Sequence, residues 1–232
     1  MAETTLATHL DWMAQGTQLF RQAVAGLSDA QLAEPSLLPG WDRAHVLAHV
    51  SRNADALINL LTWARTGVET PMYASMASRD ADIETTAALP PAQLRRDLAA
   101  STDRLDADVA AMSEQDWAGP VRTRQGRATT GAEVPWMRCR ELWVHVVDLD
   151  AGVGFAQYPG ELAQDLLAEA VAYLARADGA PSVRIRASDT GAEQVMGGGD
   201  QLVSAPTLDL LPWVLGRGGT NPAPWPPLPA WL

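Results

Sequence analysis

The 232-residue sequence is poor in the residues that several common kinds of protein site require. It has one cysteine, Cys139, which excludes an intrachain disulfide, a CxxC redox pair and a zinc site made of four thiolates. A single thiol fits a reducing compartment, so we expect the protein in the cytoplasm. We expect Cys139 to be a buried, inert thiol rather than a nucleophile.

Basic residues and long apolar runs are scarce as well. The 17 basic residues are scattered and outnumbered by 28 acidic ones, giving a net charge of −11, which argues against a nucleic-acid partner. The first residues lack the basic and then apolar pattern of a signal peptide, and nowhere do 18 uncharged apolar residues follow one another. We therefore expect no membrane partner. The expected ligands are small molecules, and the sequence does not indicate an oligomeric state.

Apolar residues make up 47% of the chain, which is enough for a buried core, and many recur at helical spacing. Four amphipathic helices are predicted, over about 6–27, 46–64, 94–112 and 134–151, with an irregular connection and a short helical piece over 70–91. These helices predict a four-helix bundle over residues 1–155, a fold whose interior can hold metal ligands. The tryptophans within this region are interpreted as core residues: Trp12, Trp41, Trp63, Trp136 and Trp143.

The pattern changes in the last third of the sequence. Residues 161–177 are helical, 182–188 alternate like a strand, 193–206 read as two short strands around a glycine turn, and 207–217 form another helix. The tail has too many prolines for a helix or a sheet, yet its tryptophans are too apolar to stay in water, so we expect it to pack as an extended segment. Residues 156–232 are thus predicted to form a small α/β domain.

One helix of the bundle carries an unusual polar stripe. Within "RCRELWVHVVDLDAG", Arg138, Glu141, His145 and Asp148 lie at i, i+3, i+7 and i+10, so they share one face of a helix. Bulky apolar residues cover nearly every other direction, and the stripe is therefore expected to be buried or to line a cavity. A hydrogen bond between Glu141 and His145 would be the plain explanation, but buried carboxylates and imidazoles are also metal ligands.

A third ligand is available on the second helix, where "RAHVLAHV" places His45 and His49 one turn apart. His45 is near the helix start, where a capping or surface role suffices, whereas His49 adjoins the apolar stripe. If His49 converges with Glu141 and His145, two imidazoles and one carboxylate would suit a catalytic zinc with an open fourth position.

Several motifs together resemble the mycothiol-dependent maleylpyruvate isomerase family. They are "LLPGWDRAHVLAHVSRNADALINLL", "ETPMYASMASRDADIE", "WMRCRELWVHVVDLDAG" and the ending "GRGG…PLPAWL", and they span almost the whole chain. The resemblance implies a DinB-like four-helix bundle that binds a divalent metal, usually zinc, followed by a small α/β domain similar to sterol carrier proteins. It also implies that His49, Glu141 and His145 are the metal ligands and that His45 is not one.

The same resemblance implies a reaction and further site residues. The family uses the thiol mycothiol to convert maleylpyruvate into fumarylpyruvate in the gentisate pathway of aromatic catabolism. Arg79 and Arg217, both in loop-like segments, match recurring arginines of the family and are candidates for holding substrate carboxylates, with Arg217 also a candidate for binding the cofactor. On residue type alone, either would be a solvated surface arginine.

Some alternatives stay open from the sequence. Asp148 is expected either to orient a metal ligand or to pair with Arg138 or Arg140. A mycothiol S-transferase would use the same metal and thiolate but consume a thiol in each turnover, and a metal-stabilised binding module would catalyse nothing.

Overall fold

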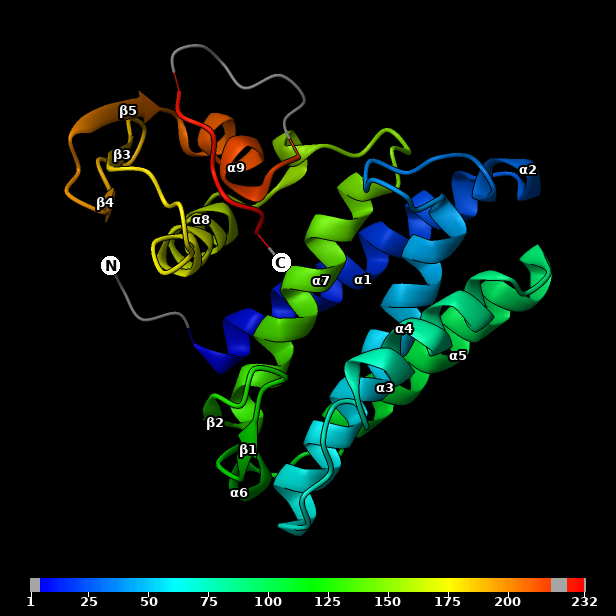
Figure 1. The fold of residues 1–232 in the computed structure, drawn as a ribbon. Helices are drawn as coiled ribbons and strands as arrows, with labels where there is room; N and C mark the ends of the chain where they lie inside the picture. Colours follow the sequence, from blue (N-terminus) through cyan, green and yellow to red (C-terminus); the bar gives the residue numbers. More distant parts are fainter. Residues whose placement is uncertain (1–4, 218–224, 232) are drawn as a thin grey trace. The chain divides into compact units, whose positions relative to one another are not determined.

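The computed structural model describes residues 5–217 and 225–231, which divide into two compact units, Met1–Gly152 and Val153–Leu232. Figure 1 shows a helical first unit and a second unit that combines helices with a small sheet. None of the helices formed by these residues is long and apolar enough to cross a membrane.

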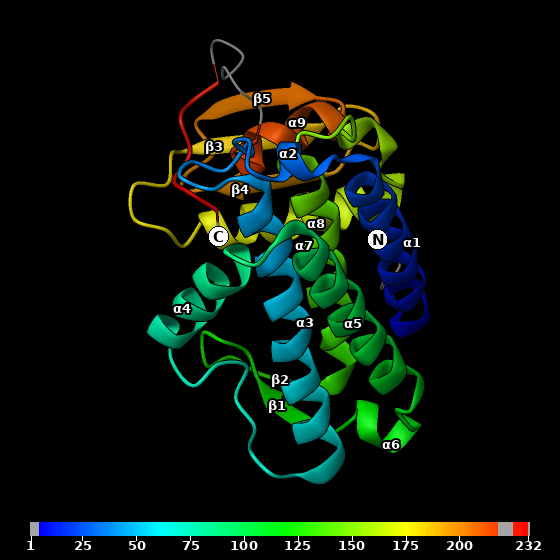
Figure 2. The same cartoon turned by 90° about the vertical axis from the view of Figure 1, so that its right-hand side faces the viewer.

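The first unit is the predicted four-helix bundle. Its long helices are α1 (Leu6–Gly26), α3 (Arg43–Thr66), α5 (Pro91–Ala110) and α7 (Val134–Asp148). Their ends follow local chemistry, because the side chain of Asp42 accepts a hydrogen bond from the His45 backbone at the start of α3, and Gly67 ends that helix at a φ of 70°. Within the bundle α7 packs against α1 and α3, and α5 packs against α3 (Figure 2).

Two arginines fix the register of α3 against α7. Near the start of α3, Arg43 Nε donates to the Leu149 carbonyl at the end of α7, at 2.6 Å. Further along α3, the Asn53 side chain accepts a hydrogen bond from Arg138, near the start of α7, at 2.9 Å. The two helices are therefore antiparallel, and the residues between these bonds on one helix face those on the other.

Smaller elements of the first unit escaped the sequence pattern. The structure adds α2 (Asp29–Leu32), α6 (Glu114–Trp117), the 3-10 turn η1 (Gly131–Glu133) and a hairpin of β1 (Pro120–Arg122) and β2 (Ala128–Thr130). Such elements are one turn or three residues long, too short to show a period. The helical piece in the connection is α4 (Met76–Ala87), three turns long and begun by a capping box between Ser75 and Ser78.

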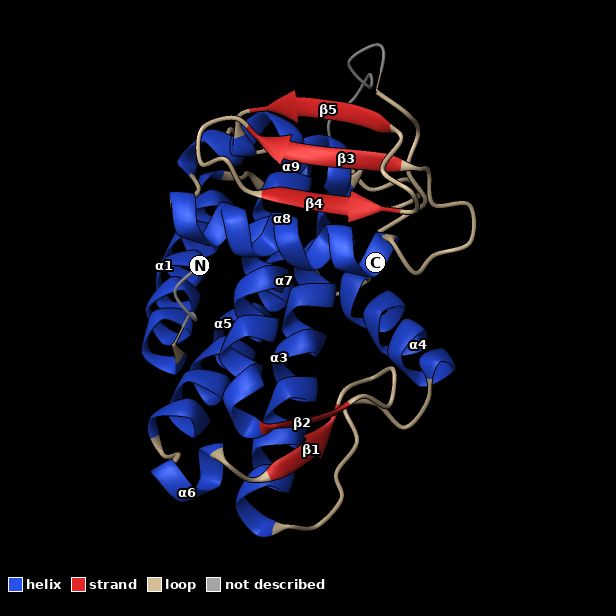
Figure 3. Ribbon diagram, turned by 90° about the vertical axis from the view of Figure 1, so that its left-hand side faces the viewer, coloured by secondary structure: helices blue, strands red, loops and turns tan. Residues whose placement is uncertain are grey.

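The second unit contains the predicted α/β elements. They are η2 (Phe155–Gln157), α8 (Gly160–Leu174), β3 (Val183–Ala187), β4 (Glu193–Met196), β5 (Gln201–Ala205) and α9 (Thr207–Leu215). The two strands that flank the glycine turn do not pair with each other, because each pairs with β3, β4 antiparallel and β5 parallel. Helices α8 and α9 pack against the sheet through β4 and β5, respectively (Figure 3).

The end of the chain packs onto its own unit. The indole nitrogen of Trp213 donates to the Pro226 carbonyl at 3.0 Å, its ring lies 5.0 Å from that of Trp225, and Trp231 is buried. Residues 225–231 therefore form the expected extended, packed segment, while 218–224 and 232 lie outside the described residues.

Three of the five tryptophans assigned to the core are buried, namely Trp12, Trp136 and Trp143. Trp41 and Trp63 are only half-buried, so their assignment to the core was wrong. Trp41 instead stands beside two histidines, its ring centroid 5.6 Å from that of His49 and 6.1 Å from that of His45. Helical spacing shows which face a residue occupies but not whether a neighbouring element covers that face.

A glycine in α1 allows the close approach of α7 and yields a stability prediction. A Cβ at Gly16 would lie 2.7 Å from Trp143 Nε1, and that ring is held in place by its 2.9 Å hydrogen bond to the Trp12 carbonyl. We expect Gly16→Ala to lower the free energy of unfolding by about 1–2 kcal/mol, since overpacking outweighs the better helix propensity of alanine. Urea denaturation followed by circular dichroism measures this change.

The matched control for this prediction is Gly26→Ala, at the C-terminal end of the same helix. A Cβ at Gly26 would have nothing within 4 Å, so the substitution should be neutral or stabilise by up to about 1 kcal/mol. Equal effects of the two substitutions would show that the contact with Trp143 does not limit the packing.

Candidate metal centre

The antiparallel register of α3 and α7 brings three predicted residues together. His49 of α3 lies opposite Glu141 and His145 of α7. The His49 Nε2 atom is 2.8 Å from Glu141 Oε2, and His145 Nε2 is 3.3 Å from the same oxygen. One potential ligand atom from each residue lies within 4.8 Å of the other two. Two imidazole nitrogens and a carboxylate oxygen at this spacing could hold a divalent metal such as zinc.

The cluster is sheltered but not sealed. The side chains of His49, His145 and Glu141 are 7%, 12% and 21% exposed, respectively. Glu141 is thus the most exposed side chain of the three.

His145 is oriented by a buried carboxylate. Its Nδ1 atom lies 2.8 Å from Oδ2 of Asp148, whose side chain is fully buried. A carboxylate accepts a proton from Nδ1, which leaves the lone pair of Nε2 for a metal ion, the arrangement usual for histidine ligands. Of the two alternatives for Asp148, the structure shows the contact with His145.

His49 has a different neighbour at its second ring nitrogen. Its Nδ1 atom lies 3.2 Å from Nη2 of Arg79, and a guanidinium can only donate. The Nδ1 atom must therefore accept, so the neutral ring carries its proton on Nε2 and donates it to Glu141. In this state Arg79 and Glu141 use both nitrogens of His49.

Arg79 was expected in a loop and lies in the first turn of α4 instead, because the capping box starts the helix at Met76. Its guanidinium carbon is 5.9 Å from the centre of the Tyr73 ring, and its Nη1 pairs with Asp80 at 2.7 Å. The motif "TPMY" contained Tyr73, but nothing in its spacing indicated that the ring would lie beside Arg79.

The electrostatics of the cluster separate the two histidines. Burial lowers the pKa of His49 to about 4, so that ring is neutral at physiological pH. Burial acts in the same direction on His145, but hydrogen bonds to Asp148 and Glu141 outweigh it and raise the pKa of His145. Burial would raise the pKa of Glu141, yet its bonds to His145 and His49 hold that pKa well below the usual range.

The structure shows other contacts for His45 and Arg217. His45 Nδ1 is bound to the helix-capping Asp42 at 2.6 Å, and its Nε2 is 3.3 Å from Glu84, which agrees with a role at the helix start. Arg217 belongs to the second unit, where its Nη1 donates to the Leu215 carbonyl at 2.7 Å and its guanidinium lies 5.9 Å from the Trp231 ring centre. A role of Arg217 in catalysis stays a prediction.

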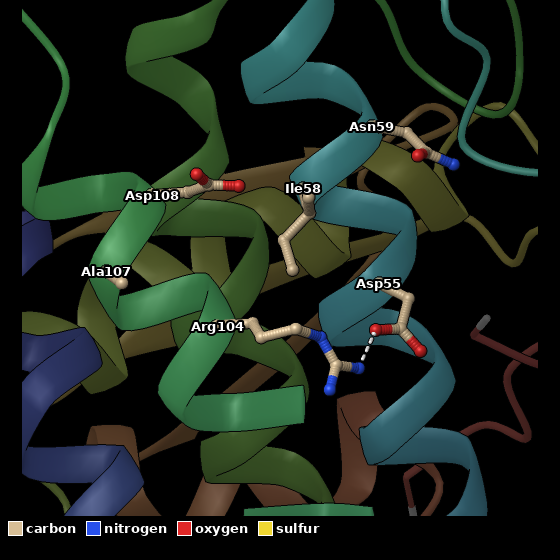
Figure 4. Close-up of a pocket in the computed structure, with 6 residues that line it drawn as sticks. All are labelled: Asp55, Ile58, Asn59, Arg104, Ala107 and Asp108. Carbon is tan, nitrogen blue, oxygen red and sulfur yellow. Dashed lines mark hydrogen bonds and ion pairs between the residues drawn. The ribbon is translucent and has the colours of Figure 1, made fainter. Parts of the chain in front are cut away.

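A surface cleft of about 410 Å³ lies between α3 and α5, and Figure 4 shows the side chains that line it. None of the predicted site residues is among them. The charge of Asp55 at this cleft is already paired with Arg104 at 2.6 Å and with Arg52 at 3.1 Å. The cleft therefore offers no unpaired charge of Asp55 to a ligand.

Comparisons with known proteins agree with this arrangement. A family model described as the mycothiol maleylpyruvate isomerase N-terminal domain matches residues 13–150. The chain belongs to the mycothiol maleylpyruvate isomerase family. No curated protein sequence matches it.

Solved structures extend the likeness beyond the bundle. The crystal structure of a mycothiol-dependent maleylpyruvate isomerase is 33% identical over 98% of both chains, with a TM-score of 0.93. The structure of a histidine-to-alanine mutant of such an isomerase has the same identity and coverage and a TM-score of 0.92. YfiT from Bacillus subtilis, a four-helix bundle, is 14% identical over 72% of this chain and 91% of its own, with a TM-score of 0.53, and shows the fold alone.

For this member of the maleylpyruvate isomerase family, the raised pKa of His145 predicts how metal binding depends on pH. Below that pKa, a metal ion has to displace a proton from His145, so the apparent zinc affinity should fall about tenfold for each unit of pH decrease. Titration of metal-free protein with zinc from pH 5 to pH 8, in the presence of a competing chelator, measures this slope.

Asp148→Asn is the control for this pH dependence. It removes the carboxylate that raises the pKa of His145, so the fall in affinity should begin at a lower pH than in the wild type. The same variant should also bind zinc about 10- to 100-fold more weakly above that pKa, since an orienting partner is lost. A flat pH profile in the wild type would contradict the assignment of His145 as a ligand.

Proposed function

We propose that this protein is a metal- and mycothiol-dependent cis–trans isomerase that converts maleylpyruvate into fumarylpyruvate. The observation that carries the proposal is the cluster of His49, Glu141 and His145 in a chain that is 33% identical to a mycothiol-dependent maleylpyruvate isomerase over nearly its full length. In this proposal the three residues hold zinc or another divalent metal. The partial exposure of Glu141 and the greater burial of the two histidines fit a site that a thiol and a small substrate reach from the Glu141 side chain.

The chemistry of the donors fits this reaction. A zinc ion held by two neutral imidazoles and one carboxylate keeps a net positive charge and would stabilise a thiol as its thiolate near neutral pH. Addition of the thiolate to the conjugated double bond of maleylpyruvate makes that bond single and moves its electron pair to the neighbouring carbonyl oxygen. Rotation and the reverse elimination then give the trans isomer and return the thiol.

The protein's own residues have to prepare the site for that cycle. Asp148 accepts the proton on Nδ1 of His145, which leaves Nε2 as the atom that can bind a metal ion, and burial keeps His49 neutral. For His49 to bind a metal through Nε2, its proton has to move to Nδ1, where Arg79 now donates. Two donors cannot share one contact, so Arg79 has to leave His49, and its guanidinium becomes available to a substrate carboxylate.

The first test of the proposed function is the fate of the thiol. Zinc-loaded protein with maleylpyruvate and a catalytic amount of mycothiol should perform many turnovers, with fumarylpyruvate formed and free thiol recovered at the end. Absorbance and mass spectrometry follow both. His49→Ala should lose bound metal and turnover together, because it removes a ligand.

Two other outcomes of that experiment would contradict the proposal. Thiol conjugates formed from other electrophiles, without isomerisation, would indicate an S-transferase. A His49→Ala variant with full metal content and normal turnover would remove His49 from the ligand set.

The two arginines give a paired prediction. Arg79→Met removes the hydrogen bond that favours the His49 tautomer with its proton on Nε2. One net hydrogen bond contributes ~1 kcal/mol, so the zinc affinity should rise about fivefold. Turnover should fall at least about tenfold, because Arg79 is then missing as a partner for the substrate carboxylate. Arg217→Ala should lower turnover similarly but leave zinc affinity unchanged, since the three proposed ligands, His49, Glu141 and His145, all belong to the first unit. Chelator competition and steady-state kinetics separate the two effects.

The two variants test different parts of the proposal, and each part can be contradicted without the other. Unchanged zinc affinity in Arg79→Met would contradict the tautomer argument, and wild-type turnover in Arg217→Ala would remove the second unit's arginine from the mechanism.

A further inference from the structure

Arg138 is the one member of the polar stripe on α7 that the proposed function leaves unused. Its side chain is fully buried, one turn before Glu141 on the same face of the helix. Its Nη1 atom donates to two acceptors on α3, the Val50 carbonyl at 2.8 Å and the Asn53 side-chain oxygen at 2.9 Å. Val50 directly follows His49, so Arg138 is hydrogen-bonded to α3 at the residue next to His49.

The rest of the guanidinium has no such partners. Nε and Nη2 of Arg138 have no hydrogen-bond partner among residues 5–217 and 225–231, and the carboxylates of Glu141, Asp106 and Asp55 act on its charge without a hydrogen bond to it. Burial lowers the pKa of Arg138 to about 10, which still leaves the group charged at neutral pH. A buried charge without a hydrogen-bonded counterion lowers stability, and an apolar side chain of similar size would often fit such a place better.

Arg43 makes the corresponding contact on the other side of the cluster. Its Nε donates to the Leu149 carbonyl at 2.6 Å and its Nη2 to the Asp150 carbonyl at 3.2 Å. The pair of His49 and Glu141 therefore lies between two arginine bridges that join α3 and α7. With both bridges in place, neither helix can slide or rotate against the other without breaking a buried hydrogen bond.

We infer that Arg138 is a positioning residue that sets the separation of His49 from Glu141 and His145 and thereby the affinity of the cluster for a metal. This inference rests on the proposed metal site. It also explains why a costly buried cation lies one turn from Glu141, because the two N–H groups of Nη1, fixed in the guanidinium plane, donate to two acceptors and an apolar side chain cannot.

The geometry and the charge of Arg138 predict opposite signs for one variant. If Arg138 acted only through its charge, Arg138→Met would remove a cation near a cationic ligand and strengthen zinc binding. Because Arg138 acts through position, Arg138→Met should weaken zinc binding at least about tenfold, while the protein stays folded and its thermal midpoint is equal or higher.

Two further variants complete the series. Arg138→Lys keeps the charge, but its ammonium group lies on a freely rotating stem and not in a fixed plane, so it should recover only part of the zinc affinity. Asn53→Asp keeps the acceptor for Arg138 and neutralises its charge, so its zinc affinity should be at or above that of the wild type. Zinc affinity by chelator competition and thermal unfolding are measured on all three variants of the full chain.

A second readout needs no metal. In the metal-free protein, His49 donates from Nε2 to Glu141, and nitrogen-15 NMR of histidine side chains reports this hydrogen bond. Arg138→Met should shift the His49 Nε2 signal and speed the exchange of its proton, whereas Asn53→Asp should change neither. If the wild type bound no zinc, the proposed function would fail. This NMR comparison would still show whether Arg138 positions His49 against Glu141.

The inference is overturned by either of two results. One is unchanged or tighter zinc binding in Arg138→Met. The other is an unchanged His49 signal in that variant. If Arg138→Met did not fold, Arg138→Lys would serve in its place, and wild-type zinc affinity together with a wild-type His49 signal in that variant would also overturn the inference.

Discussion

The antiparallel register between α3 and α7 is the constraint on which the candidate site depends. His49 comes from one helix and Glu141 and His145 from the other, so the three side chains meet only when the two helices are aligned. Arg43 and Arg138 set that alignment through hydrogen bonds to α7 and α3, respectively. Close packing of α1 on α7, with Gly16 against Trp143, holds the second ligand helix from its far side.

The sequence predicted the bundle and the cluster for physical reasons that hold in other proteins. Long amphipathic helices repeat their apolar residues often enough to reveal a period, and the stripe of Glu141, His145 and Asp148 stood out because apolar residues surround it. The spacing within α7 could be read from the chain, since i and i+4 share one face. His49 was preferred over His45 because it adjoins the apolar stripe, and the family resemblance implied the same; the structure places His49 beside the other two and binds His45 to Asp42.

Other features of the site had no signal in the sequence because they depend on contacts between distant segments. Arg79 was expected in a loop and reaches His49 from the first turn of α4, and Trp41 was expected in the core and stands half-buried beside the histidines. Arg138 could be placed on the polar stripe, but its grip on Val50 and Asn53 required the register of two helices 85 residues apart in the chain. Periodicity describes one helix or strand at a time and does not predict contacts between different elements.

The way α4 is attached to the bundle has a consequence for how this fold can change over evolution. Of its own residues α4 buries only Ile83 and Thr86, whereas α3 and α7 bury most of theirs. Most substitutions in α4 therefore cost little stability, while substitutions next to the ligands are costly. Substitutions at Arg79 or its neighbours in α4 can therefore accumulate during evolution while the bundle and the side chains of His49, Glu141 and His145 stay intact. New substrate preferences are accordingly easiest to acquire through the short helix that contributes least to the core.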